Sequence, residues 1–86
     1  MVTESAAVTS YDTELLDRIV SLRSDAELME EYARRLRGTA AVLDGCPAGP
    51  AWSRPALERQ AAACVTAAEQ LRTAAEALLA HARAGG

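Results

Sequence analysis

Aromatic and basic residues are scarce in this 86-residue chain. Aromatic residues make up 3% of it, Phe is missing, and all nine basic residues are Arg because there is no Lys. Twelve acidic residues outnumber them, so the formal net charge is −3 and the isoelectric point is near 5.0. Nucleic-acid binding needs a basic stripe or an aromatic stacking platform, and an anionic membrane surface attracts clustered cations. The composition therefore excludes both kinds of partner.

Long hydrophobic runs are also missing. No apolar run approaches the roughly 18 residues that are needed to span a bilayer. The first ten residues, MVTESAAVTS, lack the cationic start and the apolar centre of a secretory signal. We therefore expect no membrane span, and a protein that is cytoplasmic or secreted without a cleaved signal peptide.

Residues that carry chemistry are few, with two Cys and one His in the chain. Cys64 falls in a helical apolar stripe and Cys46 in a connection, so the ~5.5 Å between the Cα atoms of a disulfide would require distortion. We expect Cys64 to be a small buried apolar residue and Cys46 a free, exposed thiol, with an intermolecular or metal role for Cys46 left open. His81 is interpreted as a cation near a helix C-terminus. Without metal-ligand spacing, a phosphate loop or a nucleophile with its base, the sequence predicts no enzyme, no cofactor and no metal site.

Two long heptad stripes dominate what is present. The first comprises Leu15, Ile19, Leu22, Ala26, Met29, Ala33, Leu36, Ala40 and Leu43, and the second Leu57, Ala61, Cys64, Ala68, Leu71, Ala75, Leu78 and Ala82. An apolar period of 3.5 residues held this long indicates two helices packed lengthwise. Because one core position is almost always Ala, the two backbones can approach closely. The predicted fold is all-α, an antiparallel two-helix hairpin with an alanine-rich coiled-coil seam.

Capping and breaking residues suggest the boundaries of this hairpin. We expect a flexible N-terminal tail over 1–11, helices at about 12–44 and 54–84, and a loop over 45–53. Asp12 and Ser53 are the expected N-caps, and Gly45 is the expected C-cap of the first helix. The hairpin proper then covers 12–84.

The length of the connection predicts the register of the hairpin. Residues that face each other across the seam should have numbers that sum to about 100. Glu30 then lies near Arg72, a pair of favourable sign. Asp44 and Glu58 approach as like charges, which Arg54 or Arg37 could relieve.

Several aliphatic residues remain outside this seam. Leu16 and Leu79 share one flank near the open end of the hairpin, with Val20 beside them and Val65 further along the second helix. Single surface aliphatics need no explanation, and that reading stays open. We favour a second packing face that contacts a partner through Leu16, Val20, Val65 and Leu79. Two hairpins docked in this way form a dimer with the architecture of a four-helix bundle.

The layout resembles a known family. Trp52 stands in Pro50-Ala51-Trp52-Ser53-Arg54, a turn motif just before the second of two helices of about thirty residues. This arrangement resembles the WXG100 or ESAT-6-like proteins of type VII secretion over roughly residues 12–84. The resemblance implies a non-enzymatic protein that acts as a secretion substrate or partner through homodimerisation or heterodimerisation with another small helical protein.

The chain departs from that family at two places. Arg54 stands where the family has a glycine, and the end of the chain lacks the tyrosine-plus-acid export signal, which a heterodimeric partner could supply. The alternative function is a cytosolic helical adaptor or docking module of a larger assembly.

Overall fold

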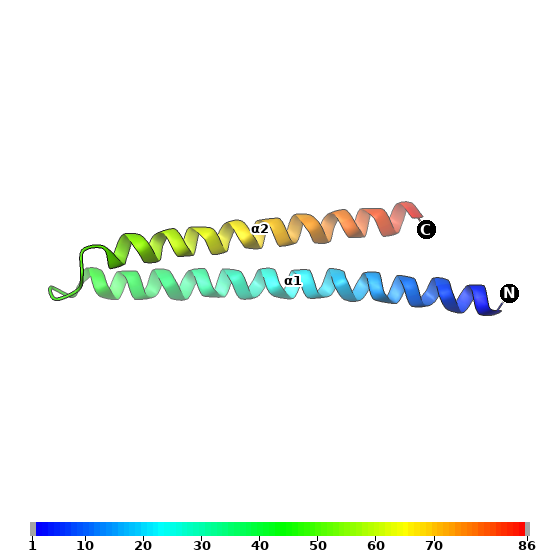
Figure 1. Ribbon diagram of the computed structural model, residues 1–86, viewed down its shortest axis with the longest axis horizontal. Coiled ribbons are helices and arrows are strands. Elements are labelled where there is room, and N and C mark those ends of the chain that lie inside the picture. Colours follow the sequence, from blue (N-terminus) through cyan, green and yellow to red (C-terminus); the bar gives the residue numbers. More distant parts are fainter. Residues whose placement is uncertain (1, 86) are drawn as a thin grey trace.

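The computed structural model describes residues 2–85, and the side chains of residues 10–85 within them. Helix α1 runs over Val2–Asp44 and helix α2 over Ser53–Gly85. The two helices lie side by side and antiparallel, joined at one end by a short turn (Figure 1). No strand occurs in the described range. The predicted all-α helical hairpin is confirmed.

The molecule is a rod. Its extents are 71 × 17 × 12 Å and its radius of gyration is 19.8 Å. A compact chain of this length would have a radius of gyration of about 12 Å. Both sides of the seam between α1 and α2 consequently lie at the surface. No helix within residues 2–85 is long and apolar enough to cross a membrane.

Helix α1 begins about three turns earlier than the capping pattern predicts. It includes residues 2–11, the segment expected to be a tail, and Asp12 lies inside the helix rather than at its N-cap. No Gly or Pro stands in this segment, and its Ser, Thr and Val residues each cost only tenths of a kcal/mol relative to Ala. A capping residue alone therefore does not start a new helix. The N-terminal part of α1 projects past the end of α2 (Figure 1).

The start of α2 also differs from the predicted cap. The Trp52 carbonyl accepts the N–H of Ala56 at 3.2 Å, so Trp52 holds the N-cap position. The Ser53 hydroxyl instead donates to the Pro50 carbonyl at 2.6 Å, and Ser53 is buried. This hydrogen bond ties the first turn of α2 to the connection.

Burial is unequal within the seam. An alanine row is almost fully buried, with each exposed by 3% or less; it comprises Ala26, Ala33, Ala40, Ala61, Ala68 and Ala75. A leucine row is only half-buried; it comprises Leu22, Met29, Leu36, Leu43, Leu57, Cys64, Leu71 and Leu78. The close contact of α1 with α2 is therefore made by the small residues, and the larger ones stand at one side of it. The larger Leu15 and Ile19 are buried near the open end of the hairpin, against Ala75.

Gly38 gives a test of helix α1. Beyond its chain neighbours and the adjacent backbone of its own helix, a Cβ atom added at Gly38 would meet no atom within 4 Å, and the residue lies in a helix interior. Gly38→Ala should raise the free energy of unfolding by about 1 kcal/mol, because Ala loses less backbone entropy in a helix. Thermal melts measure this as a rise of several degrees.

Gly49→Ala is the matched control for that change. Its Cβ atom would meet the carbonyl oxygens of Leu43 and Cys46 at 3.3 Å, and the Cys46 carbonyl already accepts the N–H of Gly49. This variant should melt below the wild type. A Gly38→Ala variant that melts no higher than the wild type would show that α1 is frayed or bent there.

Candidate protein-interaction surface

One side of the hairpin is closed by ion pairs between the helices. We call it the charged flank; it carries Glu30, Asp44, Arg54, Glu58 and Arg72. Arg72 pairs with Glu30 across the seam, as the register predicts. Arg54 donates from Nη1 to Asp44 Oδ1 at 2.7 Å and from Nε to Glu58 Oε1 at 3.3 Å. Arg54 thus joins the two like charges that the sequence places together.

Hydrogen bonds shift the pKa values of Glu30 and Arg54 on the charged flank. The hydrogen bond from Arg72, and then its charge, hold the pKa of Glu30 below the ordinary value of 4.5. The hydrogen bond to Glu58 and the negative charge of Asp44 raise the pKa of Arg54. These shifts favour the charged forms of Glu30 and Arg54, and the flank presents ion pairs to solvent.

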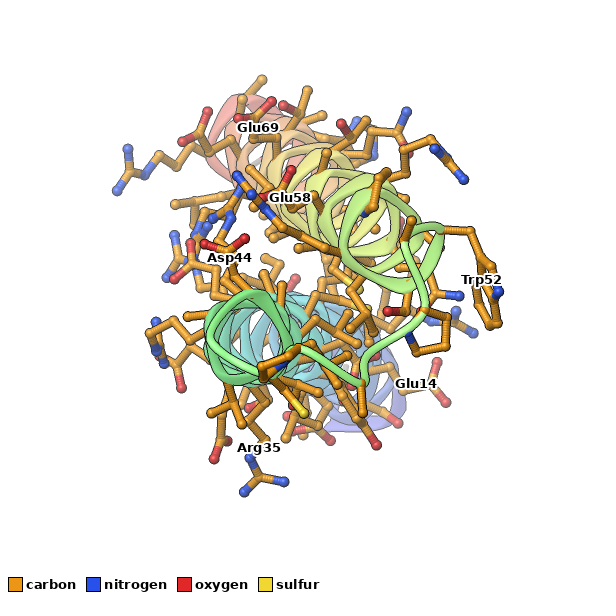
Figure 2. The ribbon with its side chains drawn as sticks, turned by 90° about the vertical axis from the view of Figure 1, so that its left-hand side faces the viewer. Glu14, Arg35, Asp44, Trp52, Glu58 and Glu69 are labelled. Carbon is orange, nitrogen blue, oxygen red and sulfur yellow. The ribbon has the colours of Figure 1, made fainter. Side chains whose placement is uncertain are left out.

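On the opposite side of the hairpin, apolar side chains line the seam. Within the described residues, no ion pair joins the two helices on this side. We call it the open flank; it consists of the leucine row and, beside it on α1, Asp25, Leu28, Tyr32 and Val42. Arg35 lies at its outer edge and points away from α2 (Figure 2). A groove of about 400 Å³ runs between the helices here, lined by Asp25, Leu28, Met29, Ala67, Gln70, Leu71 and Ala74. Leu28, Tyr32 and Val42 are exposed by 51%, 54% and 72%. Half-buried and exposed apolar side chains therefore lie next to each other at the groove, in Met29, Leu71 and Leu28.

Trp52 extends the open flank at the turn. Its side chain is 71% exposed. Figure 2, which looks along the rod from the turn, shows Trp52 projecting on the side away from Asp44 and Glu58. Glu14, near the other end of α1, lies toward the same side as Trp52. The indole of Trp52 therefore adds a large exposed apolar group to this side of the molecule.

The residues that the sequence selected for a partner differ in their exposure and in their position along the rod. Leu16 and Val20 are exposed by 53% and 61%. Leu79 is half-buried and packs against the core around Leu15, Ile19 and Ala75, and Val65 is half-buried as well. Val65 lies about 21 Å along α2 from Leu79, at 1.5 Å per residue. The pair of Arg72 with Glu30 lies between them.

The row of α1 residues beside the groove could have been found in the sequence. Asp25, Leu28, Tyr32 and Arg35 follow each other by three, four and three residues, and Val42 comes seven residues after Arg35. This is a second heptad row on α1, beside the first one. It mixes apolar and charged residues, so a search for purely apolar stripes passes over it.

The described part of the chain holds little that points to chemistry. Cys46 is exposed and Cys64 half-buried, and both thiols are free. No three His, Cys, Asp or Glu side chains of this part gather where they could hold a metal ion. The turn has a polar hollow between Asp44, Arg54 and Glu58, whose charges already pair with one another. What the geometry offers is a long apolar surface for binding.

The chain was also compared with known proteins. No family model, no curated protein and no solved structure matches it.

Proposed function

We propose that this chain is a non-enzymatic interaction protein that works by pairing its helical hairpin with another helical protein, as a homodimer or a heterodimer. The observation that carries this proposal is the half-burial of the leucine row, because a hairpin that folded for itself alone would bury its larger apolar side chains. A partner laid along the rod converts the hairpin into a four-helix bundle.

The exposed area of the chain supports the same proposal. The chain exposes 6400 Å². A compact monomer of 9.1 kDa exposes about 4,900 Å². The excess of about 1,500 Å² is larger than the ~800 Å² that each partner buries in an ordinary stable interface. The excess is therefore large enough to supply the interface with one protein partner.

The proposal extends to the WXG100-like role in type VII secretion, as a substrate or as the partner of one. Its support is the pair of long helices, with the exposed Trp52 directly before α2. Such a protein contributes a rigid surface to its complex, and its partner supplies any export signal.

Sedimentation of the purified chain tests the pairing. We expect a helical assembly heavier than 9.1 kDa at micromolar concentration, because the leucine row stays half exposed in a single hairpin. The melting temperature should rise with chain concentration. A 9.1 kDa species that unfolds cooperatively, with no dependence on concentration, would contradict pairing with itself and leave the half-buried leucine row unexplained.

A further inference from the structure

The geometry points to a second copy of this chain as the occupant of the open flank, with the two α1 helices antiparallel and the two turns at opposite ends. This inference rests on the proposed function, which requires a partner but does not say which flank it covers. Charge decides both the partner and the register.

Asp25 is the first piece of evidence. Its carboxylate lies at the edge of the apolar groove, and it takes part in none of the ion pairs within the described residues. Arg35, ten residues along the same row, pairs only with Glu31 at 2.9 Å on the surface of α1, and its side chain is 72% exposed. Asp25 and Arg35 are thus the negative and the positive group of the open flank nearest to the groove, and a partner can use both.

A two-fold axis at the level of Glu30 brings these groups together. Facing residues on the two α1 helices then have numbers that sum to about 60. Asp25 faces Arg35 of the second copy, and Arg35 faces its Asp25, so that the pair forms twice. Leu28 faces Tyr32 of the second copy, also twice. The bulky side chains next to the groove therefore meet each other at the centre of the interface.

Other registers are worse. A shift of one heptad in one direction places Arg35 opposite Arg18 of the second copy, a repulsive pair. A shift in the other direction loses both pairs of Asp25 with Arg35 and places Asp25 opposite Val42, whereas in the favoured register Arg18 faces Val42. With both turns at the same end, α1 would lie over α2 of the second copy. Asp25 and Arg35 would then face only uncharged residues near Ala74 and Ala63.

The α2 helices accept the same arrangement. The open flank of α2 carries Gln60, Ala63, Ala67, Gln70, Ala74 and Ala77. These residues bear no charge and most are small, so two α2 helices can approach in this register without like-charge repulsion. At each end, the turn with Trp52 lies beside the N-terminal part of α1 of the second copy, which projects past its own α2. Covering Trp52 there gives the dimer a spectroscopic signal.

Charge reversal tests the register. Asp25→Arg and Arg35→Asp should each raise the dimer dissociation constant about tenfold, since each turns two attractive pairs into repulsive ones. The mixture of the two variants should form a heterodimer with the affinity of the wild type, because each variant supplies the charge that the other lacks. A change that merely weakened α1 could not be rescued by mixing. If the mixture binds no better than either variant alone, the register is overturned.

A matched pair of substitutions tests the flank. Leu28 and Leu16 are almost equally exposed, at 51% and 53%, on opposite sides of the hairpin. We expect Leu28→Glu to raise the dissociation constant at least about 100-fold, by placing two carboxylates at the centre of the interface, and Leu16→Glu to leave it unchanged. The emission of Trp52 should shift to the blue on dimerisation in the wild type and in Leu16→Glu.

The outcomes separate this inference from the proposed function. A dimer that Leu16→Glu dissociates and Leu28→Glu does not would place the partner on the charged flank; the inference would fail and the function would stand. A wild-type chain that stays a folded monomer at every concentration tested would overturn the second copy as the occupant. The proposed function would then stand only as pairing with a different helical protein.

Discussion

Ala68→Leu is expected to lower the free energy of unfolding by about 1–3 kcal/mol. Ala68 is 1% exposed in the middle of the alanine row, where α1 and α2 come closest. Three added heavy atoms have no space there, so the helices must separate or the side chain must leave its preferred rotamer. Thermal melts at one fixed chain concentration should show a loss of several degrees or more.

Ala62→Leu is the control, since it adds the same atoms to the same helix. Ala62 is exposed and belongs to neither the seam nor the open flank. Leu is almost as good a helix former as Ala, so this variant should melt close to the wild type. If both variants melt alike, the helices are not in close alanine contact and the described seam is incorrect.

Ile19→Ala is expected to have the other large effect, a loss of about 2–5 kcal/mol. Ile19 is 3% exposed and packs with Leu15 and Ala75 near the open end of the hairpin. Removing its side chain leaves a cavity between the helices, where no turn holds them together. Circular dichroism during urea unfolding measures the change as a lower midpoint with an unchanged slope.

Val20→Ala separates this effect from that of helix propensity. Val20 is adjacent in sequence but 61% exposed, and Ala favours the helix slightly more than Val does. The midpoint should therefore stay the same or rise a little. A loss similar to that of Ile19→Ala would mean that Val20, together with Leu16, is covered by another chain, as the sequence analysis expected.

The register of the hairpin could be predicted because it depends on the spacing of residues along the sequence. The phase of the heptads and the length of the connection determine which residues can face each other, and the pair of Glu30 with Arg72 confirms the result. The same reasoning offered Arg54 or Arg37 as the cation between Asp44 and Glu58, and Arg54 takes that place. Helix boundaries were less predictable. Capping residues such as Asp12 are also tolerated inside helices, which is why the start of α1 differs from the expected one.

The open flank could not be predicted in the same way. The heptads identify a stripe on each helix, but they do not determine how far each helix rotates about its own axis against the other. In the structure the small alanines take the contact, which turns Met29 and Leu71 toward one side and joins them to Leu28 in a groove. The four residues predicted to contact a partner were selected because they are aliphatic and lie outside the heptad stripes. In the structure Leu16 and Val20 are exposed, whereas Val65 and Leu79 are half-buried.

The sequence by itself determined the two long helices, their antiparallel order and their register, because periodicity, turn residues and loop length are local properties of the chain. Only the tertiary structure decided which half of the seam is buried and which flank is closed by ions. The physical reason is that axial rotation follows from the closest packing of side chains on both helices at once, and the alanine row allows a closer approach than the leucine row.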